Sequence, residues 1–156
     1  MDLSMNGYSN SPTKKYKRGD VIFKEGESAE GFYIIKKGKV SVIKRRKKRI
    51  TPIYTAVEKE MLGEDCIFSN TFNYNYTAIA LKPTEAIFIE KKLVESFLGD
   101  GRDWMKNLLE LFANRLNHTS EVLAESHVRH DDLFANEEFS NSDEAFFKNI
   151  LKSVES

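Results

Sequence analysis

The sequence predicts a mainly β protein, an antiparallel barrel or sandwich, followed by a long amphipathic helix. Short runs of β-branched and aromatic residues recur between residues 16 and 90, and glycine-containing turns separate them. Beyond Leu93 the apolar residues recur instead at steps of three and four, which is the helical period. A chain of 156 residues buries about two-thirds of its surface on folding, which is enough for one core.

Residues 1–15 are predicted to form a flexible tail. They are rich in Ser, Asn, Thr and Lys and nearly lack apolar side chains. Burial of so little apolar surface does not offset the entropy lost on ordering the chain. We therefore expect the folded domain to begin at Tyr16 and to extend to residue 128.

The expected strands cover residues 21–23, 32–35, 40–43, 50–57 and 86–89. Gly19, Gly26 and Gly38 lie between or before these runs, in segments with the composition of turns. A single long helix is expected over 103–128, with Asp100 or Asp103 as its N-cap. A helix of this length beside a small barrel offers a face for a homodimer.

The segment 129–156 is acidic, and its end is predicted to be a short amphipathic helix. A Ser-Asp-Glu start at 142–144 leads into an apolar stripe between Phe146 and Val154. Because so short a helix is marginal in isolation, it must dock against something. We expect the stripe to be a second docking surface for a partner.

Composition excludes several classes of protein. Lys+Arg 24 balances Asp+Glu 24, so no global field attracts a nucleic acid or a membrane. No apolar run approaches the roughly 20 residues that span a bilayer, so we expect no transmembrane segment. Cys66 is the single cysteine, and the N-terminus lacks the apolar stretch of a secretory signal. A cytoplasmic location is therefore expected.

Six consecutive cations occupy residues 44–49, between two expected strands. The favoured interpretation is a solvated hairpin tip, because charge blocks are common there. The alternatives are a handle for an acidic partner, nucleic acid or lipid headgroups, and a contact with the acidic C-terminal segment.

An ordered series of glycine-containing segments resembles the cyclic-nucleotide-binding domain family. The segments are RGDVIFKEGE at 18–27, GFYIIKKGKV at 31–40 and LGE at 62–64, followed by AIAL at 78–81 and Glu85. The segment 113–121 on the expected long helix is similar to one in catabolite-activator-like regulators. The resemblance spans residues 16–128 and implies a jelly-roll β-barrel.

The resemblance also implies roles for individual residues. In this family a glycine-glutamate pair opens a short helix whose N–H groups hold the cyclic phosphate, and the glutamate binds the ribose 2′-hydroxyl. A Thr-Ser pair on the long helix reaches the adenine, partly across the dimer. The ligand-binding candidates are therefore Gly63, Glu64, Asp65, Cys66, Tyr74, Asn75, Thr119 and Ser120.

Tyr74 departs from the family pattern, because it stands where the phosphate-binding arginine belongs. No Lys or Arg occurs between Glu60 and Leu81. Three interpretations stay open: a pocket filled by its own rings, from Phe72, Tyr74 and Tyr76; a weak or altered nucleotide-type ligand; and ordinary binding through another cation. No cofactor is certain, and the candidates are cAMP, cGMP or a related small anion.

The sequence thus predicts a non-enzymatic regulatory module with an atypical pocket, acting through protein–protein contact with an unknown partner. The alternative is a scaffolding protein whose self-filled pocket binds no nucleotide. We expect no DNA-binding domain, because 129–156 is too short and too acidic. The residue types give no positive sign of catalysis or of a metal site; two histidines and two aspartates within 127–132 are too weak a signal.

Overall fold

The computed structural model describes residues 11–47, 49–67, 72–98, 103–126 and 141–154. Two four-stranded antiparallel sheets enclose the core, in the orders β1-β8-β3-β6 and β2-β7-β4-β5. The strands are β1 (Thr13–Tyr16), β2 (Val21–Phe23), β3 (Gly31–Lys37), β4 (Lys39–Arg46), β5 (Arg49–Val57), β6 (Met61–Leu62), β7 (Thr77–Ala80) and β8 (Thr84–Glu90). This jelly-roll-like arrangement confirms the predicted fold class.

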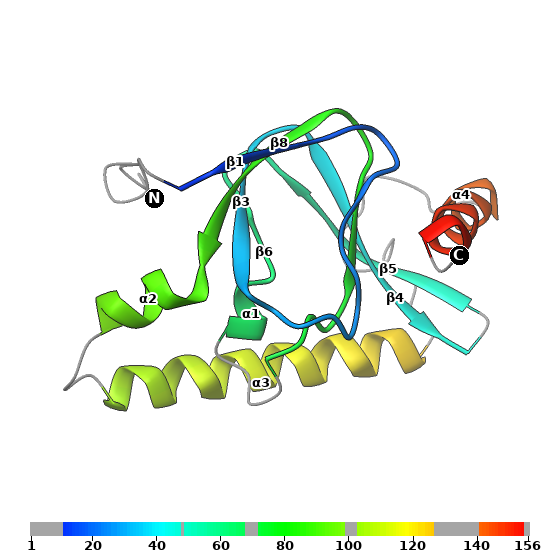
Figure 1. The fold of residues 1–156 in the computed structure, drawn as a ribbon. Helices are drawn as coiled ribbons and strands as arrows, with labels where there is room; N and C mark the ends of the chain where they lie inside the picture. Colours follow the sequence, from blue (N-terminus) through cyan, green and yellow to red (C-terminus); the bar gives the residue numbers. More distant parts are fainter. Residues whose placement is uncertain (1–10, 48, 68–71, 99–102, 127–140, 155–156) are drawn as a thin grey trace.

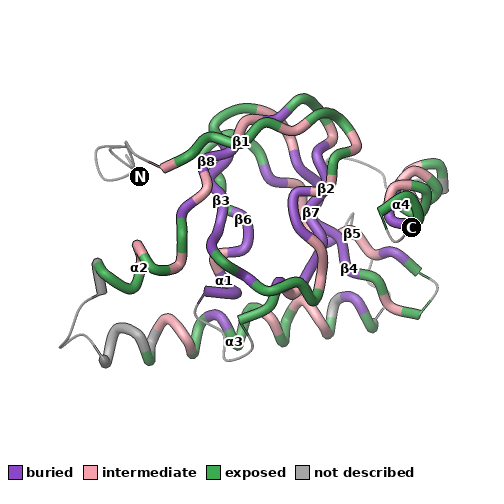
Figure 2. Tube along the Cα trace, viewed as in Figure 1, coloured by how far each residue is buried: buried purple, intermediate pink, exposed green. Residues whose placement is uncertain are grey.

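Four helices complete the described fold: α1 (Glu64–Ile67), α2 (Lys91–Leu98), α3 (Asp103–Ser126) and α4 (Asn141–Val154). The predicted long helix is confirmed as α3, which runs beneath the sheets, past α1 and toward the β4–β5 hairpin (Figure 1). Figure 2 shows buried residues concentrated on the strands and α1, whereas much of α3 is exposed. The core therefore lies between the sheets, and α3 contributes mainly one face to it.

The β3–β4 turn explains one glycine of the sequence pattern. Gly38 has a φ of 120°, which L side chains rarely adopt, and a methyl group there would approach Thr84 Cα to 2.7 Å. Both constraints require glycine, so the turn between these two strands is specified locally.

The expected tail is shorter than predicted. Strand β1 begins at Thr13 and pairs with β8, from Thr13 opposite Ile87 to Tyr16 opposite Thr84. The hydrogen bonds that β1 forms with β8 offset the entropy lost on ordering these residues. The composition of the segment does not reveal this pairing. Residues 13–15 thus belong to the folded domain, and residues 1–10 lie outside the described part.

The prediction of a solvated hairpin tip for the basic run 44–49 holds for Arg45, Lys47 and Arg49, which are exposed, but not for Lys44 and Arg46. Lys44 is fully buried (0% exposed) inside β4, and its Nζ lies 2.5 Å from Glu121 Oε1 on α3. Arg46, at the end of β4, binds Glu121 and also Glu25. Lys47 lies in the turn, with a φ of 56°, and residue 48 is outside the described part. Two of the cations therefore act as internal ion-pair partners.

The apolar stripe of α4 packs on its own sheet and is not offered to a partner. Phe147 (3% exposed) and Leu151 join a cluster with Ile43, Ile50 and Ile79 on β4, β5 and β7. The C-terminal end of α4 is also held, because Lys24 Nζ donates to Val154 O at 3.1 Å. The prediction of a second docking surface is wrong, because this sheet face was itself apolar and required a cover.

Candidate functional site

The candidate site is built on the junction between β6 and α1. Gly63 follows β6 with a φ of 81°, and the chain turns directly into α1. A methyl group on Gly63 would approach Tyr74 Cε1 to 2.7 Å. Glycine is required here by the backbone conformation and by the closeness of the tyrosine ring.

Tyr74 occupies the space over Gly63. Its ring stacks on that of Phe23, with centroids 3.9 Å apart and an interplanar angle of 15°. Its hydroxyl donates to Gly31 O at 2.7 Å, and the residue is 5% exposed. Burial raises the pKa of this hydroxyl, so it stays protonated. The side chain is thus a neutral, fully hydrogen-bonded part of the core.

Tyr76 uses the backbone donor of the same turn. Gly63 N–H donates to the Tyr76 hydroxyl oxygen at 2.7 Å. The hydroxyl oxygen of a further tyrosine, Tyr54, lies 3.4 Å from the hydroxyl oxygen of Tyr76. The N–H that an incoming anion would use at this turn is therefore already satisfied by a side chain.

The carboxyl groups of α1 are poorly solvated, and among the described residues no cation contributes to their pKa shifts. Desolvation raises the pKa of both Glu64 and Asp65, and their proximity adds to the shift of Glu64. Glu64 Oε2 is buried and has no hydrogen-bond partner within the described part of the chain. Cys66 Sγ donates to Asp65 Oδ1 at 3.4 Å, and Asn75 Nδ2 donates to that sulfur at 3.7 Å. The site accordingly disfavours a further negative charge.

The fold therefore assembles six of the eight sequence-predicted ligand residues: Gly63, Glu64, Asp65, Cys66, Tyr74 and Asn75. The remaining two, Thr119 and Ser120, use their hydroxyls within α3. They donate to the carbonyls of Arg115 and Leu116 at 2.9 and 3.0 Å. Such back-bonding is the usual behaviour of these residues inside a helix.

Several aromatic residues of the site were not identified from the sequence. Phe23 stacks on Tyr74 and lies 5.8 Å from the ring of Tyr33, between centroids. Strand periodicity marks these positions as core, but it does not say that their rings converge on a binding site. Phe72, grouped with the tyrosines by sequence, is exposed, and Lys91 Nζ lies 3.2 Å from its ring centroid. Of the three rings that the sequence suggests as pocket fillers, those of Tyr74 and Tyr76 are buried and that of Phe72 is exposed.

A second polar cluster joins α3 to the hairpin. Glu121 pairs with Lys44 and Arg46, and Arg46 Nη1 binds Glu25 Oε1 at 2.6 Å. The hydrogen bond from Arg46, followed by that from Lys44, lowers the pKa of Glu121 to about 2. Helical spacing could have indicated this role, because Glu121 lies three residues before the buried Ala124.

Among the described residues, no group of three or more His, Cys, Asp or Glu side chains is arranged to hold a metal ion. The His and Asp residues at 127–132 lie outside the described part. None of the described helices combines the length and apolarity needed to cross a membrane.

Comparisons with known proteins agree on one family. A model of the cyclic nucleotide-binding domain matches residues 13–100. The CRP-like cAMP-activated global transcriptional regulator of Mycobacterium tuberculosis is 28% identical over 111 residues, which is 70% of this chain and 49% of that protein. The chain thus spans about half the length of the curated relatives it matches.

Solved structures show the same fold. The cAMP-bound form of the EAL enzyme Bd1971 aligns with a TM-score of 0.66 and 20% identity, covering 78% of this chain and 32% of that one. The sensor domain of the transcriptional regulator DNR from Pseudomonas aeruginosa aligns with a TM-score of 0.58 and 21% identity, covering 88% of this chain and 87% of that one. At these identities the likeness concerns the fold alone.

Proposed function

Because the chain belongs to the cyclic nucleotide-binding domain family, we propose that it is a non-enzymatic regulatory module whose nucleotide site is filled by tyrosines. It acts through contact with other protein chains. The observation that carries the proposal is the position of Tyr74, stacked on Phe23, hydrogen-bonded to Gly31 O and in contact with Gly63. A neutral, buried ring lies where the family resemblance leads us to expect a cation.

The residues of this site do not fit a cyclic nucleotide. An arginine–phosphate contact in a desolvated pocket contributes about 2 to 5 kcal/mol, which corresponds to a factor of tens to thousands in affinity. Tyr74 supplies no charge, Tyr76 already accepts the Gly63 N–H, and the carboxyl groups of Glu64 and Asp65 offer no countercharge to a phosphate. The ligand would also have to displace two buried rings.

Calorimetry with cAMP and cGMP tests this proposal. We expect no saturable heat with either ligand up to about 1 mM, because neither the space nor the countercharge is available. Saturation at micromolar ligand that is lost in Glu64→Ala, but kept in Glu58→Ala, would contradict the proposal. Glu58 is a matched control because it is an exposed carboxylate just before β6.

The contact surface that we infer is the exposed face of α3, with a second copy of the chain as the occupant. Four large apolar side chains of this helix are exposed: Leu111, Phe112, Leu116 and Val122. Solvent exposure of so many large apolar groups on one helix is unfavourable unless they are covered. Pairing two such helices along a common seam would bury them.

Leu116→Glu is expected to convert a dimer into a monomer in sedimentation velocity. Leu116 is 58% exposed, so the change should leave the melting temperature of the monomer nearly unchanged. Asn114→Glu is the control, since it introduces the same charge at an exposed position two residues away. A monomeric unaltered protein, or equal dimer in Leu116→Glu, would exclude this interface.

A scaffolding protein that senses no ligand remains the second candidate, and the filled site favours it. The two candidates differ in what they predict for the rest of the molecule. A regulatory module requires a signal that does not enter through the tyrosine-filled site, whereas a scaffold requires no signal.

A further inference from the structure

The described part of helix α3 is attached to the domain by small side chains and by ion pairs. Among its described side chains, the buried ones are Ala113 and Ala124. Burial of a methyl group contributes less to stability than a charge-assisted hydrogen bond does. The ion pairs of Glu121 with the end of β4 are therefore an important attachment of the C-terminal half of α3.

Arg46 is the residue that extends this attachment beyond the hairpin. Its Nε donates to Glu121 Oε2 at 3.0 Å and its Nη2 donates to Glu121 Oε1, so the two side chains form a bidentate pair. The same guanidinium donates from Nη1 to Glu25 Oε1 at 2.6 Å. Because a guanidinium is planar and rigid, the bidentate pair with Glu121 fixes the direction of the Nη1 donor. Arg46 thus joins α3 to the loop after β2.

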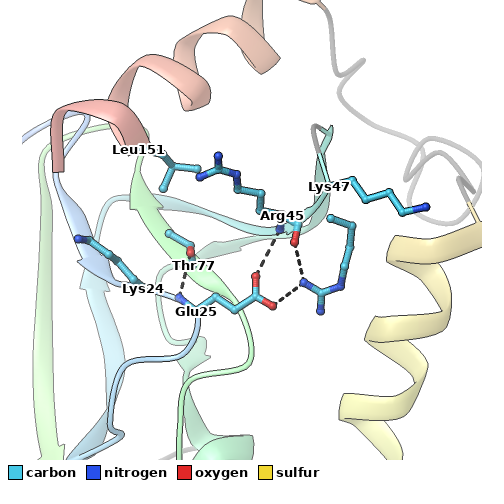
Figure 3. Close-up of a pocket in the computed structure, with 7 residues that line it drawn as sticks. Lys24, Glu25, Arg45, Lys47, Thr77 and Leu151 are labelled. Atoms are coloured by element: carbon cyan, nitrogen blue, oxygen red, sulfur yellow. Dashed lines mark hydrogen bonds and ion pairs between the residues drawn. The ribbon is translucent and has the colours of Figure 1, made fainter. Parts of the chain in front are cut away.

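Glu25 carries this connection into the loop after β2. Figure 3 shows its side chain reaching from that loop to the end of β4. Its carboxylate also accepts from the Arg45 N–H at 3.3 Å, and its own N–H donates to Thr77 Oγ1 at 3.0 Å. The start of the loop is therefore positioned by bonds to β4 and β7.

The residues that follow Glu25 hold Tyr74 in place. Gly26 N–H donates to Tyr74 O at 2.8 Å, and Tyr74 N–H donates to Glu27 O at 2.9 Å. The Tyr74 hydroxyl donates to Gly31 O at 2.7 Å, at the start of β3. All three polar groups of Tyr74 are thus bonded to the segment that begins directly after Glu25.

We propose that Arg46 makes the closure of the tyrosine-filled site depend on the docking of α3. The inference rests on the proposed function, in which that site is closed and α3 is the contact surface for a second copy. While α3 is docked, Glu121 orients the guanidinium that positions Glu25, and the loop keeps Tyr74 over Gly63. A partner that draws α3 away breaks the Glu121 pair and leaves Arg46 and Glu25 as a partly exposed pair, which is weak. Contact at α3 therefore loosens the segment that holds Tyr74.

Amide hydrogen exchange in the full chain, measured by NMR, tests this coupling. The reporters are the N–H groups of Gly26, Ala29 and Tyr74, because each bonds between the loop after β2 and residues 72–74. The amides of β7, a buried central strand, serve as the reference for unfolding of the whole domain. Exchange of the reporters relative to β7 measures local opening of the loop.

Two chains are compared that differ only in the Arg46–Glu121 pair: one carries Lys44→Met, and the other carries Lys44→Met with Glu121→Ala. The lysine is replaced in both, so neither chain contains a buried ammonium without its carboxylate. We expect the reporters to exchange about fivefold faster without Glu121, which is the lower end of typical coupling between sites. Glu125→Ala in the Lys44→Met chain removes an exposed carboxylate from the next turn of α3 and is expected to change nothing.

The route through Glu25 is tested by adding Glu25→Ala to both chains. Glu121→Ala is then expected to cause no further acceleration, because the loop has already lost its bond to Arg46. Equal reporter exchange with and without Glu121 overturns the inference. The same acceleration with and without Glu25 also overturns it, and indicates that α3 acts through its contact with α1. If Lys44→Met does not fold, Glu121→Gln is compared with the unaltered chain, with the same expected direction.

The outcomes separate this inference from the proposed function. Faster reporter exchange without Glu121 in a chain that is monomeric supports the coupling and contradicts only the pairing through α3. Unchanged reporter exchange in a dimeric chain that binds no cAMP overturns the coupling and leaves the proposed function intact.

Discussion

Glu121→Ala is expected to lower the free energy of unfolding by about 3 kcal/mol. The substitution leaves the ammonium of Lys44, which is fully buried, without the carboxylate that lies 2.5 Å from it. Removing one partner of a buried pair costs about 3 to 5 kcal/mol. The Glu121 side chain is 39% exposed, so water reaches this end of the pair, and the lower value applies. Urea unfolding measures the change.

A rescue variant separates the buried charge from other effects at this position. Adding Lys44→Met to Glu121→Ala removes the orphaned charge and is expected to recover most of the lost stability. Arg46 retains Glu25 as a partner in both variants. If Glu121→Ala costs less than about 0.5 kcal/mol, as a surface pair would, the burial of Lys44 is not a determinant of stability.

The same residue predicts a pH dependence. The pKa of Glu121 is about 2 in the folded protein, below its ordinary value of 4.5. The unfolded chain therefore binds more protons between these values, so stability rises with pH across this window. The contribution of Glu121 is complete above about pH 5 and is lost as the pH falls toward 2. Glu121→Ala should lack this part of the acid-induced loss.

Phe147→Ala is expected to release α4, at a cost of about 3 kcal/mol in the free energy of its docking. Phe147 is buried against Ile43, Ile50 and Ile79, and a buried Phe→Ala change typically costs about 3 to 5 kcal/mol. The released helix is too short to persist alone, so limited proteolysis should cut within 141–154. Lys148→Ala, an exposed change on the same helix, should leave the cleavage pattern unaltered. Equal protease resistance in both variants would exclude docking through Phe147.

Much of the architecture follows from local patterns in the sequence. Short runs rich in β-branched and aromatic residues predicted five of the strands, and apolar residues at helical spacing predicted α3 to within its C-terminal turn. Strands β1, β6 and β7 were not predicted from these patterns. Thr13–Tyr16 and Met61–Leu62 are short or polar, and they are stabilised by pairing with β8 and β3.

The candidate site was only half predictable for a related reason. Sequence order located the glycine–glutamate turn, and the family resemblance predicts that Tyr74 stands where the family has an arginine. The Tyr76 hydroxyl accepts from the Gly63 N–H of this turn, and the Tyr74 hydroxyl donates to Gly31 O on β3. Both contacts depend on which side each ring faces and on distances between separate strands. One-dimensional patterns do not carry that information.

By itself, the sequence determined the strand and helix periods, the glycine turns and the absence of a cation from residues 60–81, because each of these depends on residue type and spacing alone. The tertiary structure alone decided which charges and apolar stripes were left for a partner. Lys44 meets Glu121 across 77 residues, and Phe147 meets Ile43 on a strand more than 100 residues earlier. The physical reason is that burial and ion pairing are properties of neighbours in space, so a basic run or an amphipathic stripe has no fixed role until the chain folds around it.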